Sequence, residues 1–421
     1  MEWTHYLSKQ NSRIGKESWK TKEGRWAIVS LASIPLVMTL GNSMLIPVLP
    51  TFEERLNITA FQSSMIITVY SIVAILLIPI AGYLSDRIGR KKVIIPSLLL
   101  AAIGGIISGW ASWKVDNPYS LILIGRALQG VGAAGAAPIV LPLIGDMYKN
   151  ESDVSHCLGI IEAANTFGKV ISPILGAFLA GIIWFLPFFS IPLFCAISIV
   201  LMFIFIKAPP EKQKAMKPRQ FLSNLKEIFQ REGRWLYAIF MIGAILMFVL
   251  FGILFFLSSM LEDKHQIDGV NKGFALALPL GALCLASYIA GKKIEKNKIL
   301  MKWLTFIGVF LLAAAIFMIS FFDNIWIQLA IFLFSGIGIG IALPCLDALI
   351  TEGIEKEERG TITSIYSSMR FVGVALGPPA VAVLMKQSDS MMFYILTGLC
   401  LLAGIVILTG IKPSKEGSEM T

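Results

Sequence analysis

Charged residues are scarce in this sequence of 421 residues. Asp, Glu, Lys and Arg together make up 15% of it, whereas soluble domains contain about 25%. Hydrophobic residues make up 56%. A chain of this composition lacks the polar surface that a water-soluble protein exposes, and this argues against a large soluble helical protein.

Cysteine and histidine are also rare, with five and three residues. The cysteines show no paired spacing and fall in or beside apolar stretches, where a cysteine serves as a small packing residue. Outside those stretches the sequence lacks a nucleophile–base pair, a metal-ligand cluster and a phosphate-binding loop. We therefore expect no disulfide, no metal site, no cofactor and no enzymatic activity.

The hydrophobic residues gather in twelve nearly uncharged stretches. Most have the length of about 20 residues that a helix needs to cross the hydrocarbon core of a bilayer. They predict an all-α protein that crosses the cell membrane twelve times. The first 25 residues are polar and basic, which is typical of a tail and not of a cleavable signal peptide. The predicted spans lie near 26–50, 62–84, 93–112, 119–143, 157–180, 182–206, 235–259, 273–291, 303–322, 326–350, 361–385 and 390–411.

The basic residues are distributed unevenly between the two sides of these spans. Of the 36 Lys and Arg residues, 28 lie in the tails and loops on one side and five in the loops on the other. Cytoplasmic loops carry the excess of Lys and Arg, so this distribution predicts that both termini are cytoplasmic. The net charge of +9 is thus a signal of membrane topology, and it does not predict nucleic-acid binding.

A basic segment over 207–234 divides the spans into two groups of six. Within it, apolar residues at helical spacing over 221–229 predict an amphipathic helix lying in the membrane interface. The predicted parts are a cytoplasmic tail (1–25), a six-helix bundle (26–206), the linker (207–234), a second six-helix bundle (235–411) and a cytoplasmic tail (412–421).

The two groups of six spans contain similar residues at corresponding positions. Two sets of small and helix-bending residues recur at offsets of 206 and 205, and such a match in consecutive spans favours a duplicated six-helix unit. The pairs are Gly130 and Gly336, Gly132 and Gly338, Pro138 and Pro344, Gly168 and Gly373, and Pro173 and Pro378.

The loop after the second span reads GYLSDRIGRKK over residues 82–92. It resembles the signature loop of the major facilitator superfamily, G-x-x-x-D-R/K-x-G-R/K-R/K. In that family the loop acts as a conformational latch on the cytoplasmic side, so the resemblance implies a latch. Asp86 could accept hydrogen bonds from a neighbouring helix end or basic side chain. The implied latch residues are Gly82, Asp86, Arg87, Gly89 and Arg90.

The fourth span contains Arg126, followed by Gln129-Gly130-Val131-Gly132. This resembles the second motif of the same superfamily, in which the arginine is linked to proton coupling. An arginine inside a span costs on the order of 3 kcal/mol on insertion scales, which makes it a functional candidate. The alternative is a structural arginine paired with a nearby carboxylate.

The fifth span contains Gly168, Pro173 and Gly176 in a pattern that resembles the antiporter motif of drug and metabolite exporters. Ser172 and Ala177 stand where glycines are usual, and both are small. The resemblance covers nearly the whole chain. It implies two pseudo-symmetric six-helix bundles and the twelve-span, proton-driven exporter branch. The residues expected to act in helix packing and gating are Gly168, Pro173, Gly176, Gly373, Gly377 and Pro378.

Four ionisable side chains lie deep in the predicted spans: Arg126, Glu162, Lys169 and Arg370. Glu162, Asn165 and Lys169 fall on one face of a helix, with the outer two separated by two turns, or roughly 10 Å. A polar stripe of this kind predicts a water-filled cavity. Arg370 corresponds to Asn165 in the repeat, so we expect both to line that cavity.

Among these four groups, cations outnumber acids by three to one, and the first span has no acid, with Asn42 as its most polar deep residue. We hypothesise an anionic or mixed-charge substrate, such as an organic acid, a peptide-like metabolite or a catecholate siderophore. Alternatively, the cations pair with Glu162, Asp146 or Asp347 and contact no substrate. The predicted substrate-binding residues are Asn42, Asn165, Lys169, Tyr366 and Arg370.

The favoured hypothesis is a proton-coupled exporter that works by alternating access and uses the proton gradient. Glu162, the only deep acid among these four groups, is the first candidate to carry the proton, with Arg126 and Asp86. The alternatives are a broad multidrug efflux pump, a nutrient importer and a non-transporting membrane receptor. The expected partners are a small-molecule substrate, protons and the lipid bilayer, and the usual state of the family is a monomer.

Overall fold

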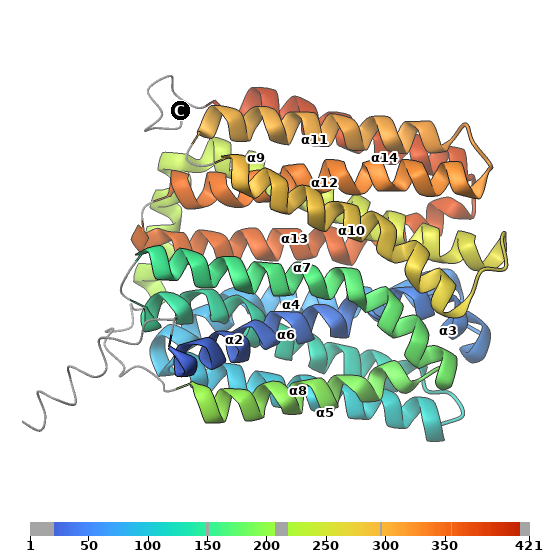
Figure 1. Ribbon diagram of the computed structural model, residues 1–421, viewed down its shortest axis with the longest axis horizontal. Coiled ribbons are helices and arrows are strands. Elements are labelled where there is room, and N and C mark those ends of the chain that lie inside the picture. The colour runs from blue at the N-terminus through green and yellow to red at the C-terminus, as the bar shows by residue number, and fades with distance from the viewer. Residues whose placement is uncertain (1–20, 149–150, 207–217, 295–296, 355, 413–421) are drawn as a thin grey trace, which may run out of the picture.

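The computed structural model of the protein describes residues 21–148, 151–206, 218–294, 297–354 and 356–412. Across these ranges the chain forms helices and turns, without strands. Twelve of the described helical segments are long and apolar enough to cross a membrane, and they coincide with the twelve predicted stretches. The predicted all-α fold is confirmed, with its helices running along one common direction (Figure 1).

The first span is divided into α2 (Lys22–Ser43), η1 (Ile46–Val48) and α3 (Leu49–Leu56). Because Pro47 has no N–H, it cannot donate to the carbonyl of Ser43, and the hydrogen bonding of α2 stops there. The remaining helices of the N-terminal half are α4 (Ala60–Ile88), α5 (Arg90–Lys114), α6 (Tyr119–Met147), α7 (Glu151–Ile182) and α8 (Leu186–Phe205).

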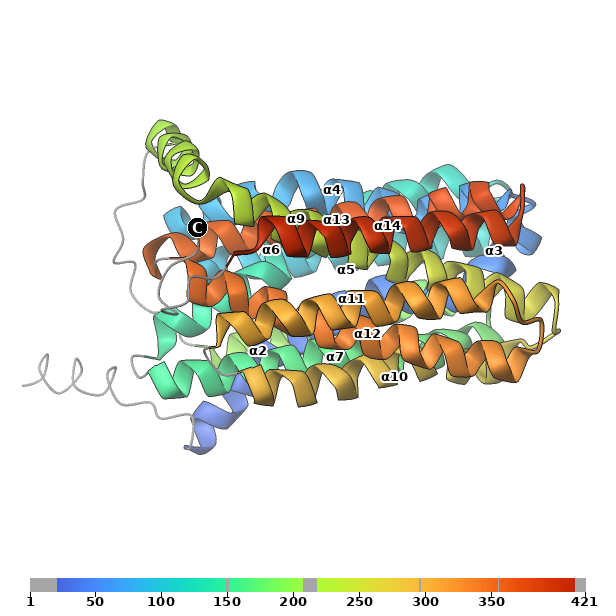
Figure 2. The same cartoon turned by 90° about the horizontal axis from the view of Figure 1, so that it is seen from above.

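The C-terminal half begins with an unusually long helix, α9 (Pro218–Asp263), of 46 residues. The segment predicted as a separate amphipathic helix is therefore continuous with the seventh span. Its first turns lie at an angle to the bundle (Figure 2). Their place in the membrane interface stays a prediction. The other helices are α10 (Gly269–Ile294), α11 (Lys298–Ile319), α12 (Ile325–Gly353), α13 (Lys356–Met385) and α14 (Asp389–Gly410).

The two halves repeat the same packing. Helix α5 packs on α6 and α2 on α7, and in the second half α11 packs on α12 and α9 on α13. The halves meet through α4 against α13 and α7 against α10, which are themselves equivalent pairs. The fold is thus the predicted pair of pseudo-symmetric six-helix bundles.

The repeated glycines explain how this packing is encoded. A Cβ on Gly130 would lie 2.4 Å from the carbonyl oxygen of Tyr70 on α4, and one on Gly336 would lie 2.1 Å from that of Pro279 on α10. These distances are too short for any side chain, so only glycine permits the helices to approach this closely. Each member of the pair therefore fixes the same contact in its own half.

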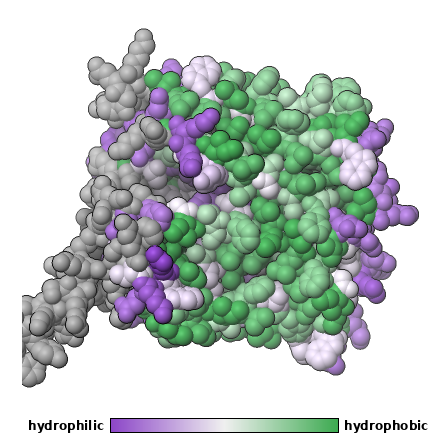
Figure 3. Space-filling view, in the orientation of Figure 1, coloured by the Kyte–Doolittle hydropathy of each residue, from purple (hydrophilic) through white to green (hydrophobic). Residues whose placement is uncertain are grey.

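The apolar cores show where the two halves are joined. One core contains residues of both halves, and its members from the N-terminal half all come from the end of the bundle away from Thr21 and Lys412. There, the hydroxyl of Ser258 on α9 donates to the carbonyl of Ile46, 3.1 Å away. A second core is confined almost entirely to the N-terminal half. The halves are thus joined by a shared apolar core at the end away from the described chain termini. Hydrophobic side chains cover the middle of the outer face and hydrophilic ones lie near the two ends (Figure 3).

Candidate functional site: a charged cluster between the two halves

A cluster of charged side chains brings together residues of both halves. Arg370 on α13 pairs with Asp347 on α12, with 3.5 Å between Nη1 and Oδ1. The Arg370 guanidinium also lies over the ring of Tyr366, 5.6 Å from its centroid. The Asp347 side chain is 41% exposed and that of Arg370 is 20% exposed. This ion pair is therefore long and reached by water.

Lys169 on α7 faces this pair from the N-terminal half. Among the described residues it forms no ion pair at contact distance, but the charges of Glu162, Arg370 and Asp347 act on it. Cys284 on α10, the only one of the five cysteines that is not buried, also lies within electrostatic range of Lys169. The cluster therefore draws on helices of both halves.

The polar stripe on α7 is present as the sequence indicated. The hydroxyl of Thr39 on α2 donates to Oδ1 of Asn165, 2.5 Å away. The amide nitrogen of Asn165 in turn donates to Oε1 of Glu162 at 3.3 Å. Glu162 is exposed, and Asn165 and Lys169 are half-buried. The amide of Asn165 thus links α2 to the acid of the cluster.

The expected excess of cations in this site is wrong. The structure brings Asp347 into the cluster and leaves Arg126 out of it, so two cations face two acids. From the sequence, Asp347 is only an alternative partner of the cations, and it lies three residues before the predicted end of its span at 350. However, α12 continues to Gly353, which sets Asp347 deeper. A lone acid in an otherwise uncharged stretch was the signal that could have identified it.

Arg126 forms a separate network inside the N-terminal half. Its side chain is fully buried. The guanidinium lies over the ring of Tyr70, with its central carbon 4.5 Å from the centroid. Among the described residues it donates only to neutral oxygens: the carbonyl of Ile66 at 2.7 Å, the carbonyl of Gly41 at 3.1 Å, Oε1 of Gln129 at 2.5 Å and Oδ1 of Asn42 at 2.6 Å. The alternative of an arginine paired with a carboxylate is therefore wrong.

This network also settles the position of Asn42. Its side-chain oxygen is engaged by Arg126, and the residue is buried. The structure thus joins Asn42 to Arg126 and not to Lys169 and Arg370. Because the acceptors come from α2, α4 and α6, the guanidinium fastens three helices of one half together. The coupling role of Arg126 and the substrate role of Asn42 stay predictions.

The signature loop forms a compact ionic network at the end of α4. Arg90 pairs with Asp86 and, through Nε at 3.1 Å, with Asp146 of α6, and it donates to the hydroxyl of Ser85 at 2.7 Å. Gly89 joins α4 to α5 with φ of 99°, a backbone conformation that L-residues rarely adopt.

Gly82 and Arg87 lie outside these ionic contacts. A Cβ on Gly82 would lie 3.8 Å from the hydroxyl of Ser364 on α13, so Gly82 faces the other half. Arg87 is exposed. The loop therefore connects helices of one half by charge and contacts the other half at a glycine, and its action as a latch stays a prediction.

The small residues expected to pack α7 and α13 lie against equivalent helices. A Cβ on Gly176 would lie 1.9 Å from the carbonyl oxygen of Met44, and one on Gly168 would lie 3.0 Å from Leu36, both beside α2. On α13, a Cβ on Gly373 would lie 2.1 Å from the carbonyl of Ala244 on α9.

The remaining packing residues occupy the same two helices. A Cβ on Gly377 would lie 2.5 Å from the carbonyl oxygen of Phe248 on α9. The carbonyl of Pro173 faces Gly273 of α10, where a Cβ would lie only 2.7 Å away. Pro378 lies inside α13. Both helices thus pack closely on the first helix of their own half, and the gating role stays a prediction.

Comparison with known proteins identifies the family. The chain matches the profile of the Major Facilitator Superfamily over residues 31–378. It is 54% identical over 394 residues to a bacillibactin exporter of Bacillus subtilis (strain 168), covering 93% of this chain and 98% of that protein. It is 25% identical to multidrug resistance protein 2 of the same organism, covering 92% and 94%.

Among solved structures, a bacterial homologue of the human lysosomal transporter Spinster has a TM-score of 0.74 at 14% identity, covering 94% of this chain and 100% of that chain. This likeness agrees with the fold of twelve spans. Because the family profile spans most of the chain and a relative of high identity matches nearly from end to end, the chain belongs to the major facilitator superfamily and is a multi-pass membrane transporter, not an enzyme.

Proposed function

We propose that this transporter exports a siderophore across the cell membrane in exchange for protons. The observation that carries the proposal is the identity of 54% with a bacillibactin exporter over 98% of that protein's length. Such a match extends over nearly all of both chains and is not confined to one half of the fold. The proposed cargo is therefore bacillibactin or a siderophore of the same chemical kind.

The charged cluster supports an anionic cargo even though its charges balance. Lys169 has no contact ion pair among the described residues, and the Asp347 partner of Arg370 is 3.5 Å away and partly exposed. Both cations can therefore turn to a cargo anion without breaking a tight pair. A cargo held between them would contact both halves, which is what a binding site for alternating access requires.

The sealed end of the bundle supports loading from the cytoplasm. The shared apolar core and the Ser258 contact close the halves on the side away from the described termini, and the side chains of the cluster are partly exposed. If the excess of Lys and Arg marks that side as cytoplasmic, this conformation receives cargo from inside. Labelling of Cys284 by a water-soluble maleimide from the cytoplasmic side only, with protection by the cargo, is the expected result.

Proton coupling is proposed to depend first on Glu162. The carboxylate is exposed between the halves and hydrogen-bonded to Asn165, so it can exchange a proton with water on the open side. Arg126 and Asp86 are proposed to act indirectly. Arg126 holds the helices of one half together, and Asp86 does so through the ionic network of the signature loop.

Transport into inverted membrane vesicles tests the proposal. With the interior acidified, iron-free bacillibactin should accumulate, and a protonophore should stop the accumulation. Bacillibactin that stays outside energised vesicles, in which a second exporter works normally, contradicts the proposed cargo. Accumulation that persists after the gradient has collapsed contradicts the coupling and leaves the cargo standing.

A second candidate function is multidrug efflux. It is favoured by the similarity to multidrug resistance protein 2 and by the two acids of the cluster, Glu162 and Asp347, which suit a cationic drug. The same vesicles discriminate the two functions when a cationic dye and bacillibactin are offered in parallel. Movement of the dye without bacillibactin would favour this alternative.

A further inference from the structure

The first helix of each half contains the same four residues, Glu-Gly-Arg-Trp. They are residues 23–26 at the start of α2 and residues 232–235 within α9, at an offset of 209. The two copies lie at the same end of the two bundles and begin equivalent spans. They differ in what their side chains contact.

The copy in the C-terminal half is satisfied by the protein itself. Nη2 of Arg234 donates to the carbonyl of Thr409 in the last turn of α14, 3.2 Å away. The indole nitrogen of Trp235 donates to Glu232 at 2.7 Å, and Trp235 is fully buried. Gly353 leaves room for this ring, because a Cβ there would lie 2.7 Å from it.

The copy in the N-terminal half is left open. Trp26 is 44% exposed and its ring stacks on that of Phe205, with centroids 5.3 Å apart. The side chains of Arg25 and Lys22, which precedes this copy by one residue, are exposed. Among the described residues they have neither an ion pair nor a hydrogen bond.

The last helices of the two halves differ in the cations that donate to their ends. In the C-terminal half, both Lys302 of α11 and Arg234 donate to carbonyls at the end of α14. In the N-terminal half, Lys91 of α5, the helix equivalent to α11, donates to the carbonyl of Ile206 at 2.7 Å. Among the described residues, Arg25 makes no contact at the end of α8 that corresponds to the contact of Arg234 with α14.

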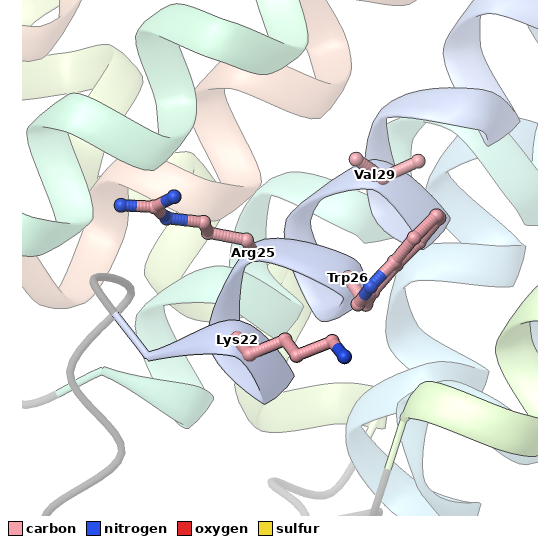
Figure 4. Close-up of a pocket in the computed structure, with 4 residues that line it drawn as sticks. All are labelled: Lys22, Arg25, Trp26 and Val29. Carbon is pink, nitrogen blue, oxygen red and sulfur yellow. The ribbon is translucent and has the colours of Figure 1, made fainter.

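These side chains line an open hollow on the outer surface of the bundle. The hollow has a volume of about 470 Å³ and is lined by Lys22, Arg25, Trp26 and Val29. The four residues follow the spacing i, i+3, i+4 and i+7, so they form one stripe along α2. Figure 4 shows the two cationic side chains spreading to either side of this stripe, with the Trp26 ring beside Lys22 and Val29 farther along the helix.

The side chains of this stripe change from charged to apolar along the helix, in the same order as a bilayer changes from headgroups to acyl chains. Two unpaired cations come first, then an indole of the kind that gathers at the headgroup level, and then an exposed apolar side chain in Val29. An anionic phosphate group suits the cations, and acyl chains suit Trp26 and Val29. We infer that this hollow binds an anionic phospholipid by its headgroup, in the leaflet at the end of the bundle that carries the chain termini.

Tryptophan quenching by brominated lipids tests the inference. The full chain is reconstituted into phosphatidylcholine nanodiscs that contain an equal fraction of brominated phosphatidylglycerol or brominated phosphatidylcholine. The signal of Trp26 is obtained as the difference between the wild type and Trp26→Phe. Brominated phosphatidylglycerol should quench this signal more strongly than the zwitterionic lipid does.

Substitutions test whether Lys22 and Arg25 cause the preference for phosphatidylglycerol. The pair Lys22→Gln and Arg25→Gln should reduce the preference for phosphatidylglycerol roughly tenfold, because each cation near an anionic membrane surface contributes to binding. The conservative pair Lys22→Arg and Arg25→Lys should keep it and shows that the fold tolerates changes here. As matched control, Lys292→Gln with Lys293→Gln removes two exposed cations from the same end of the other half and should keep the preference.

Three outcomes overturn the inference. Equal quenching by the two lipids in the wild type shows that the hollow has no headgroup preference. A preference that survives the loss of Lys22 and Arg25 charges, or that falls equally in the control pair, reflects general attraction to the basic end. A preference removed by soluble glycerol phosphate assigns the hollow to a free phosphate compound and not to a lipid.

Discussion

The two halves of this transporter share a helix scaffold but differ in chemistry. At the position where α6 carries Arg126, the equivalent residue on α12 is Phe332, and both are fully buried. Where α12 carries Asp347, α6 has Leu141. The two halves therefore share their packing contacts but differ in the charged groups they carry. The N-terminal half holds a buried polar network, and the C-terminal half presents an ion pair to the space between the halves.

This contrast suggests a division of labour. A guanidinium bonded to α2, α4 and α6 fixes their relative positions, which favours motion of the N-terminal half as a rigid body. An ion pair that is 3.5 Å long and partly exposed can open for a ligand at little cost. The four predictions below test this comparison, in order of decreasing effect.

Replacing Arg126 should have the largest effect. Arg126→Leu leaves four buried oxygens without their donor, which costs on the order of 3 kcal/mol or more. Thermal unfolding in detergent should show a large drop in midpoint, and transport should fall to background. The equivalent change Phe332→Leu replaces one apolar side chain by another and should be much milder. Similar losses in the two variants would remove the proposed difference between the halves.

The shared scaffold should respond equally in the two halves. Gly130→Ala and Gly336→Ala each force a methyl group against a carbonyl oxygen, at 2.4 Å and 2.1 Å, and should each destabilise the protein by about 1–3 kcal/mol. Gly145→Ala is the control, because nothing lies within 4 Å of its Cβ position. Unfolding midpoints measure all three. Loss of stability in only one of the pair would show that the equivalent contacts are not equally important.

Glu162 should control the use of the proton gradient without affecting the fold. With a gradient of one pH unit, exchange for one proton supports roughly tenfold accumulation of cargo. In Glu162→Gln this accumulation should be lost, while the amount of folded protein in the membrane stays at the wild-type level. Ser367→Ala, at the equivalent position of α13, is the control. Accumulation retained in Glu162→Gln would move attention to Asp86 or Asp347.

The sequence predicted the features that depend on local pattern. Span positions follow from hydropathy, and the glycine pairs follow from an offset that can be read without coordinates. The stripe of Glu162, Asn165 and Lys169 follows from the helical period alone. Each of these features concerns residues on a single helix, or contacts repeated between equivalent helices, and each is present in the structure.

The features that the sequence did not predict depend on pairing between helices. Hydropathy defines the end of α12 only to within a few residues. For this reason Asp347 was not predicted as a member of the charged cluster. Two of the four neutral partners of Arg126 are backbone carbonyls, which no residue type in the sequence identifies. The two copies of Glu-Gly-Arg-Trp have the same sequence, and only the contacts and burial of their Arg and Trp side chains distinguish them.

The smallest expected effect concerns Asp347, and it tests whether the charge peculiar to the C-terminal half selects the cargo. In Asp347→Asn the guanidinium of Arg370 loses its carboxylate and becomes free for an anionic cargo. Because the pair is partly exposed, its loss should lower the KM for an anionic siderophore only about two- to fivefold. A neutral analogue should show no change.

The control for this variant is Asp323→Asn, which removes the same charge from an exposed site at the connection of α11 and α12. It should leave both KM values at the wild-type level. A KM for the anion that rises in Asp347→Asn would mean that the carboxylate holds Arg370 in a binding geometry and does not compete with cargo. The ion pair would then be part of the binding site. Lys169, and not Arg370, would be the cation that is free to bind the cargo.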